Sequence, residues 1–154
     1  MKISRKADYA LRVLFTLIDQ RGAGPLSMTQ LAQQNDVPKK FLEHIMLGLK
    51  EQGWVESSPG RFGGYALTVS PERITMGQVI RRFGGLIAPI GCVSVTQNLV
   101  CTQSHRCRFR RVFLDVRNLT ARYLDNLTLA SVAGMEPVDE REVFALELVA
   151  GDGI

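Results

Sequence analysis

The chain lacks the long apolar segments that mark membrane and secreted proteins. No apolar run among its 154 residues approaches the roughly 18 residues that a membrane-spanning helix needs. The first residues, Met-Lys-Ile-Ser-Arg-Lys, lead into an amphipathic pattern rather than the apolar core of a signal peptide. We therefore expect a cytoplasmic protein with no membrane partner.

The motifs of common enzyme classes are also missing. The sequence contains no glycine-rich nucleotide-binding motif and no recognisable Ser/His/Asp catalytic set. It contains no internal repeat or low-complexity segment, and its hydrophobic content of 45% with 22% charged residues is ordinary for a globular protein. The sequence therefore favours a binding protein over an enzyme, and no small-molecule substrate is expected.

Acidic residues are scarce over most of the chain. Residues 1–133 contain 18 Lys and Arg against 9 Asp and Glu, whereas residues 134–154 contain one Arg against six acids. A basic body suits a polyanionic partner, because neutralisation of phosphates drives non-specific binding to nucleic acids. A mixed, solvated surface would have a similar composition, so charge alone does not identify the partner.

The strongest functional signal begins with two short helices. Ser27-x-x-Gln30 forms a capping box at the start of the first helix. A turn at 35–36 ends this helix, and Pro38 fits the first position of the second, where a missing N–H costs little. In the second helix, apolar residues recur at helical spacing and are expected to be buried. They are Phe41, Leu42, Ile45, Met46 and Leu49.

A glycine-rich hairpin follows the two helices. Trp54-Val55 begins a strand, residues 57–64 are typical of a turn, and residues 65–67 form the return strand. Two short helices, a tight turn and such a hairpin predict a winged helix-turn-helix. This unit places its second helix in the major groove of DNA and its wing against the backbone or the minor groove.

The exposed side of the second helix supplies the candidate DNA contacts. Lys39 and Lys40 suit phosphates or guanine edges, Glu43 can accept from a cytosine amino group, and His44 can reach a base or a phosphate. Arg61, flanked by glycines at the wing tip, suits a minor groove, although the same residue types also occur on ordinary solvated surfaces. The full candidate set is Ser27, Thr29, Pro38, Lys39, Lys40, Glu43, His44, Lys50 and Arg61.

Further helices are expected on both sides of this unit. Residues 6–20 carry a helical stripe with Ser4 as cap, and Asp8 lies in the first turn, where a carboxylate complements the helix dipole. Thr75-x-x-Gln78 starts a short helix. From residue 108, apolar steps of three and four continue for about 19 residues, a rod of roughly 28 Å. This seam is expected to bury against the same helix of a second subunit, or against the first helix of its own chain.

All three cysteines, Cys92, Cys101 and Cys107, fall in a stretch without periodicity that predicts a long loop. An odd number of thiols in a reducing compartment argues against structural disulfides. Thiolates in an irregular loop are natural ligands of an iron–sulfur cluster or zinc, although no CxxC pair is present. Buried unligated thiols and thiols that sense oxidants are the alternatives. The candidates for a fourth ligand are His105, Asp8 and a residue of a second subunit.

These motifs together resemble the Rrf2 family of bacterial transcription regulators, whose members include IscR, NsrR and RirA. The resemblance covers the chain up to about Val132. The matching segments are Met1-Lys2-Ile3-Ser4, residues 8–12, the helix-turn-helix at 31–49, the wing Gly60-Arg61-x-Gly63-Gly64-Tyr65-x-Leu67, the three-cysteine loop, and residues 124–129.

The resemblance implies a homodimer in which the long helices cross and each loop holds a cluster near the partner's DNA-binding domain. It implies that Cys92, Cys101 and Cys107 bind this cluster. In NsrR-like members an acidic residue near the start of the first helix, supplied by the other subunit, completes the coordination, and Asp8 occupies that place. IscR-like members use a histidine just after the third cysteine, and residues 108–111 contain none. The gap between the first two cysteines is longer than in typical NsrR or IscR sequences and nearer to that of RirA. The resemblance therefore does not decide between a 2Fe–2S and a 4Fe–4S cluster.

The sequence thus predicts a mainly α protein with a small β-hairpin wing. We expect a winged helix-turn-helix domain at 1–85, a cluster loop at 86–107, a dimerisation helix at 108–133 and an acidic tail at 134–154. Alternating apolar residues permit a strand at 144–148. The expected function is a dimeric repressor that binds a double-stranded DNA operator and is controlled by an iron–sulfur cluster sensing nitric oxide, iron or redox state. The alternative is a cluster-free regulator of the same type that senses oxidants through its thiols.

Overall fold

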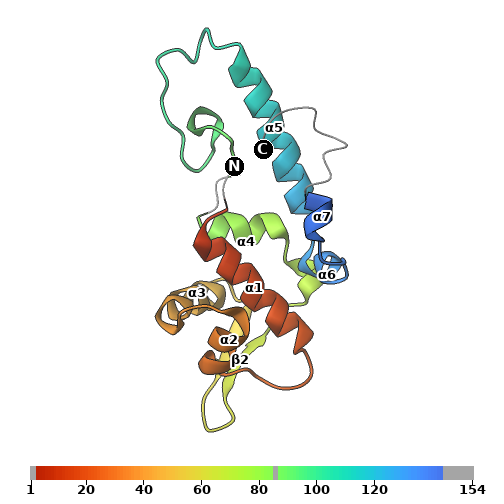
Figure 1. Ribbon diagram of the computed structural model, residues 1–154. Coiled ribbons are helices and arrows are strands. Elements are labelled where there is room, and N and C mark those ends of the chain that lie inside the picture. Colours follow the sequence, from red (N-terminus) through yellow and green to blue (C-terminus); the bar gives the residue numbers. More distant parts are fainter. Residues whose placement is uncertain (1–2, 85–86, 144–154) are drawn as a thin grey trace.

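The computed structural model describes residues 3–84 and 87–143. The molecule is elongated, with a helical body and a hairpin at one end and one long helix rising at the other (Figure 1). The α-helices are α1 (Arg5–Asp19), α2 (Met28–Asn35), α3 (Lys39–Glu51), α4 (Met76–Arg82), α5 (Phe109–Asn126), α6 (Leu129–Ala133) and α7 (Glu140–Val143). Strands β1 (Val55–Ser58) and β2 (Gly64–Leu67) form the hairpin, and 3₁₀ turns span Pro71–Arg73 and Gly91–Val93. The predicted fold class is confirmed.

The predicted helix caps are present. The Ser4 hydroxyl accepts a hydrogen bond from the Ala7 amide at 3.1 Å and begins α1. Capping boxes begin α2 at Ser27 and α4 at Thr75. The prediction for Pro38 was wrong by one position, because α3 begins at Lys39 and Pro38 is its cap. Proline still suits this position, since its extended backbone leads into the helix and its missing N–H needs no partner.

The hydrophobic core lies around α1, which is covered on several sides. Residues on both the predicted stripe and its flank are buried, including Leu14 and Val13. Helices α2, α3, α4 and α6 and strand β2 all contact α1. The edge-to-face pair of Tyr9 and Phe41, with ring centroids 5.4 Å apart, ties α1 to α3. This packing fixes the direction in which α3 presents its outer face.

The wing is anchored to the body by a third backbone segment. Strands β1 and β2 are antiparallel, with Val55 opposite Leu67 and Ser58 opposite Gly64. The Leu26 amide donates to the Tyr65 carbonyl at 3.0 Å, and the Tyr65 amide donates to the Leu26 carbonyl at 2.8 Å. A side chain at Gly64 would collide with the Leu26 backbone. The residues just before α2 therefore hold the base of the hairpin in register.

The region expected to form the dimerisation segment, 108–133, contains two helices, α5 and α6. Leu127 is extended after α5, and the Thr128 hydroxyl caps α6 by accepting from the Ser131 amide at 3.1 Å. Leu129 is fully buried, and its amide donates to the Ile74 carbonyl at 2.8 Å. The helix is interrupted at Leu127, and Leu129 packs into the body.

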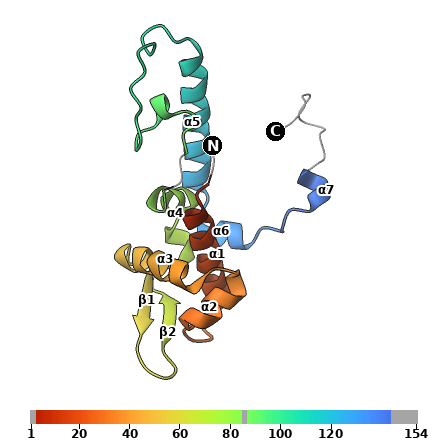
Figure 2. The same cartoon turned by 60° about the vertical axis from the view of Figure 1, so that its left-hand side comes forward.

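The remaining segments add two short elements to those expected from the sequence. The predicted loop at 86–107 contains the turn Gly91–Val93, and the acidic tail contains α7. The strand suggested for 144–148 falls outside the described residues. Figure 2 shows α7 standing away from the helical body. Among the helices of residues 3–84 and 87–143, none has the length and apolar character of a membrane span.

Candidate DNA-binding surface and cysteine pocket

Helix α3 has a buried face and a charged, exposed face. Leu42, Ile45 and Leu49 point into the core, whereas the predicted contact residues of α3 are all exposed. The turn before α3 is tight, because Asp36 adopts a left-handed conformation with φ of 51°. The exposed predicted residues are Lys39, Lys40, Glu43, His44 and Lys50. This arrangement leaves a polar helix face free to enter a groove.

Two of the predicted DNA contacts also have structural roles. The Lys50 ammonium donates to the Ser57 hydroxyl at 2.8 Å and so links α3 to β1. The Ser27 hydroxyl accepts from the Gln30 amide at 3.3 Å within its capping box. Thr29, by contrast, is exposed in the first turn of α2. Lys50 therefore helps to fix α3 relative to the wing, and Ser27 fixes the start of α2.

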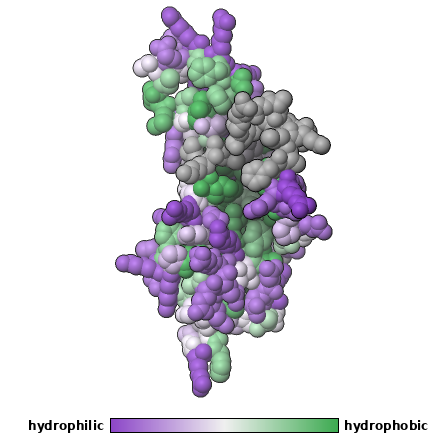
Figure 3. Space-filling view, viewed as in Figure 1, coloured by the Kyte–Doolittle hydropathy of each residue, from purple (hydrophilic) through white to green (hydrophobic). Residues whose placement is uncertain are grey.

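The wing tip carries an exposed aromatic residue that was missing from the sequence prediction. Phe62 is 86% exposed, and the Arg61 guanidinium lies 5.7 Å from the centre of its ring. In the space-filling view, hydrophilic and hydrophobic surface lie side by side on the projecting tip (Figure 3). Phe62 could have been noticed in the sequence, because the predicted turn at 57–64 otherwise contains only serine, proline, arginine and glycine.

The three cysteines lie around one pocket at the opposite end of the molecule from the wing. The loop that carries them lies beside the start of α5 (Figures 1 and 2). Cys92, Cys101 and Cys107 all line a cavity of about 340 Å³. Cys101 is exposed, and the other two are partly buried. The fold therefore brings together three thiols that span 16 residues of sequence.

Two arginines of α5 hold the first part of the cysteine loop in place. Arg110 donates to the Cys92 carbonyl at 3.0 Å. Arg117, about two turns further along the helix, donates to the Val93 carbonyl at 2.8 Å. These bonds tie the turn at Gly91–Val93 to the side of α5.

The other proposed ligands lie apart from this pocket within one chain. Asp8 forms an ion pair with Arg12, one turn along α1, at 2.9 Å, and it lines neither cavity beside the cysteines. His105 is exposed. Within the described part of the chain, no three His, Cys, Asp or Glu residues are grouped so that they could hold a metal ion. The thiols are chemically suited to iron and surround one cavity, but they do not converge into a closed coordination site in a single chain.

Helix α5 has an apolar face that the rest of the described chain leaves uncovered. Phe109 and Leu119 are each 63% exposed, and no residue of α5 is buried. The exposed apolar residues are Phe109, Val112, Val116, Leu119 and Tyr123. They recur at steps of three and four, which is the pattern of a helix that packs against another helix.

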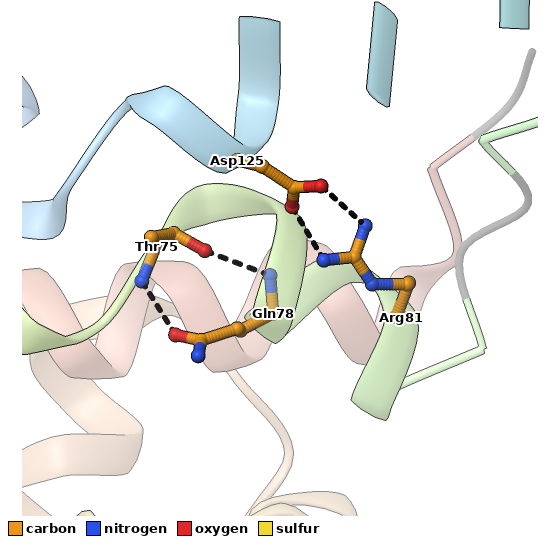
Figure 4. A network of polar contacts seen from close by, with 4 residues as sticks. All are labelled: Thr75, Gln78, Arg81 and Asp125. Carbon is orange, nitrogen blue, oxygen red and sulfur yellow. Dashed lines mark hydrogen bonds and ion pairs between the residues drawn. The ribbon is translucent and has the colours of Figure 1, made fainter. Parts of the chain in front are cut away.

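The lower end of α5 is firmly joined to the body (Figure 4). Asp125 forms an ion pair with Arg81 of α4, and a second oxygen–nitrogen contact between the same groups measures 3.3 Å. The Met76 amide donates to the Leu127 carbonyl at 2.9 Å. Helices α4 and α5 are thus linked by both side chains and backbone.

Comparison with known proteins identifies a family. The family model Rrf2, described as an iron-dependent transcriptional regulator, matches residues 3–134. An Rrf2-like helix-turn-helix regulator of Rhodobacter capsulatus is 38% identical over 133 residues, covering 82% of this chain and 89% of that protein. CymR of Bacillus subtilis is 32% identical, with 86% and 90% covered. NsrR of the same species is 31% identical, with 84% and 88% covered.

Solved structures of similar proteins have the same architecture. CymR of B. subtilis, described as the global cysteine regulator, superimposes with a TM-score of 0.72 at 32% identity, covering 86% of this chain and 96% of that chain. IscR of T. potens superimposes with a TM-score of 0.66 at 26% identity, covering 90% of this chain and 94% of that chain. The similar proteins thus include regulators with three different names.

Proposed function

Since this chain belongs to the Rrf2 family of transcriptional regulators, we propose that it binds operator DNA as a homodimer and that an iron–sulfur cluster at its cysteines controls the affinity. The observation that carries this proposal is the cavity shared by Cys92, Cys101 and Cys107. It lies beside the helix that would join two subunits. We propose that the regulator is a repressor.

DNA binding is assigned to α3 and the wing. Lys39 and Lys40 at the start of α3 are exposed and suit phosphates or guanine edges, whereas Glu43 and His44 are positioned one turn later for base edges. Arg61 and Phe62 at the wing tip would enter the adjacent minor groove. Two recognition helices of a dimer must match half-sites about one helical turn apart, so operator affinity depends on how the subunits are joined.

Dimerisation is assigned to the uncovered face of α5. Burial of its five exposed apolar side chains against a second copy would remove large apolar surface from water. The same contact would bring the cysteine loop of one subunit toward the other subunit. Asp8 of the second subunit is the proposed fourth ligand, since within one chain it lies apart from the thiols.

The three thiolates would hold the cluster, which supplies sensitivity to nitric oxide, iron supply or oxidants. In the protein itself, the arginine contacts to the carbonyls of Cys92 and Val93 connect the loop to α5. The junction of α5 with α4 connects that helix to the DNA-binding body. A coupling free energy of about 1–3 kcal/mol along this route changes operator affinity by roughly 5- to 150-fold.

The test is to purify the full chain without oxygen and measure iron, sulfide and visible absorbance. The proposal expects a coloured protein whose absorbance is lost in Cys101→Ala, together with a change in operator affinity. Cys101 is suited to this test because it is exposed and its replacement leaves the core intact. Equal DNA affinity of the loaded, iron-free and Cys101→Ala proteins would refute the coupling.

Two observations favour a second function. Cys101 is exposed, and one similar solved structure is an oxidized form of CymR from Staphylococcus aureus. The cysteines would then sense oxidants directly as thiols. A colourless protein without iron or sulfide, whose operator affinity changes reversibly with peroxide and dithiothreitol, would favour this alternative.

A further inference from the structure

A second cavity borders the cysteines on the side of α5. It measures about 410 Å³, and Cys92 and Cys107 form part of its wall, as they do in the cavity that all three thiols share. The rest of its lining includes the polar side chains of Ser94 and Asn98. This second cavity is referred to below as the arginine cavity, because three arginines of α5 complete its wall. They are Arg110, Arg111 and Arg117.

The arginine cavity has a strong excess of positive charge. Residues 73–114 contain seven arginines and no Asp or Glu. Within residues 3–84 and 87–143, ion pairs involve Arg12, Arg81 and Arg82, and none of the three cavity arginines. Two of the three are held in place by carbonyl groups. Fixed guanidinium groups without carboxylate partners attract anions and raise their local concentration.

The cavity combines this charge with reactive sulfur. Cys107 lies just before α5, directly before Arg108, and is partly exposed. An anion held by the guanidinium groups would therefore lie beside a thiol. Cys101 is more exposed than Cys107 but does not line the arginine cavity. If exposure alone decided the order, Cys101 would react first with an anionic reagent. If the arginine cavity directs the reagent, Cys107 reacts first.

We propose that the arginine cavity binds small anionic disulfides and directs them to form a mixed disulfide with Cys107. The thiolate sulfur of Cys107 attacks one sulfur of the disulfide R–S–S–R. A Cys107–S–S–R bond forms, the original S–S bond breaks, and the other half leaves as the thiolate R–S⁻, which takes a proton from water. The added disulfide is the oxidant, Cys107 is oxidised, and the departing half is reduced.

This reaction concerns the chain without a bound cluster, because a thiolate that binds iron is not free to attack. Only the effect of this reaction on DNA binding rests on the proposed function, and the disulfide exchange itself does not. The carboxylates of the disulfide would be held by the three arginines, and the loop would be locked in a modified state until a thiol reverses the exchange. Regulation by the anionic thiol pool of the cell would follow.

The experiment compares three disulfides of different charge on iron-free, full-length protein. The probes are glutathione disulfide, which is anionic, bis(2-hydroxyethyl) disulfide, which is neutral, and cystamine, which is cationic. Each rate of mixed-disulfide formation is measured by intact mass and divided by the rate with a short cysteine peptide, which removes intrinsic reactivity. Peptide mapping identifies the modified cysteine.

We expect the normalised rate for glutathione disulfide to exceed that for cystamine at least about tenfold at low ionic strength, and the ratio to fall as salt is added. Modification should occur first at Cys107. Arg111→Ala should remove most of the preference and Arg111→Lys should keep it. Arg111 is the appropriate target because, within residues 3–84 and 87–143, its guanidinium takes part in none of the loop bonds made by Arg110 and Arg117 and in no ion pair. Arg122→Ala, on the same helix outside the cavity, is the matched control.

Equal normalised rates for the three probes, first modification at Cys101, or an unchanged preference in Arg111→Ala would each overturn the proposal. None of these measurements involves DNA. A chain that fails to bind operators but shows the anionic preference would contradict the proposed function alone, and the reverse result would contradict the disulfide site alone.

Discussion

Arg81 and Asp125 form an ion pair that joins the DNA-binding body to the long helix. The two side chains come from α4 and α5, 44 positions apart in the sequence, and each is about 40% exposed. Exposed pairs contribute only about 0–1 kcal/mol to stability. The pair is therefore better suited to fixing an orientation than to holding the fold together.

The first prediction concerns this pair. Asp125→Asn should change the free energy of unfolding by less than about 1 kcal/mol but weaken the link between the cysteine loop and operator binding. Operator titrations of iron-loaded and iron-free protein should therefore differ less in the variant than in the natural chain. Asp115→Asn, also on α5 and without an ion pair among the described residues, is the control. An undiminished difference in Asp125→Asn would show that the coupling runs elsewhere.

The second prediction tests the base of the wing. Gly64→Ala should destabilise the protein by about 1–3 kcal/mol, because the added methyl group meets the backbone of Leu26 and lies 2.9 Å from the Ser27 nitrogen. Urea unfolding measures the loss, and operator affinity should fall with it. Gly134→Ala is the control, since its nearest neighbour, the Ser131 carbonyl, is 3.8 Å from the added atom. Equal stability of the two variants would contradict this account.

The third prediction concerns the wing tip. Arg61→Ala should weaken operator binding and lower the slope of log affinity against log salt by about 1, since the minor groove loses one cation and fewer counterions are released on binding. Phe62→Ala should weaken binding without changing that slope, because its contact is apolar. Neither change should alter stability, as both side chains are exposed. If both variants bind like the natural chain, the wing tip does not touch DNA.

The fourth prediction concerns a buried amide between α1 and the turn. Asn35 is 7% exposed, accepts from the Thr16 hydroxyl at 3.0 Å and donates to the Leu31 carbonyl at 2.9 Å. Asn35→Ala should cost about 1–3 kcal/mol of unfolding free energy, because the Thr16 hydroxyl and the Leu31 carbonyl each lose their hydrogen bond to the Asn35 side chain. Thr16→Val should cost less, since the amide of Asn35 keeps its bond to Leu31. A neutral Asn35→Ala would mean that water replaces the lost bonds.

The fifth prediction separates dimerisation from folding. Leu119→Asp should leave the stability of a single chain nearly unchanged, because Leu119 is 63% exposed there. In a dimer joined through α5, the same change would bury an unpaired charge and shift the protein to monomers. Light scattering measures the mass, and Arg122→Asp on the charged side of α5 is the control. A dimer that survives Leu119→Asp would place the interface on another surface.

The local features of this fold were predictable. Caps such as Ser27 and Thr75 act within three residues, and apolar steps such as Leu42 to Ile45 define a helix face without reference to the rest of the chain. The comparisons confirmed the family resemblance. It could be recognised from the sequence because its motifs are short and local. The roles of the DNA-contact residues and of Asp8 as a ligand stay predictions.

The sequence by itself determined where most helices begin, which of their faces are apolar, and that three thiols share an irregular loop, because these properties depend on neighbours within a few residues. Only the tertiary structure decided that Leu129 packs into the body and that Lys50 bonds to the wing. It also decided that Arg110, Arg111 and Arg117 line one cavity with two of the thiols. Contacts of this kind depend on the summed packing of the whole chain, which no local pattern contains.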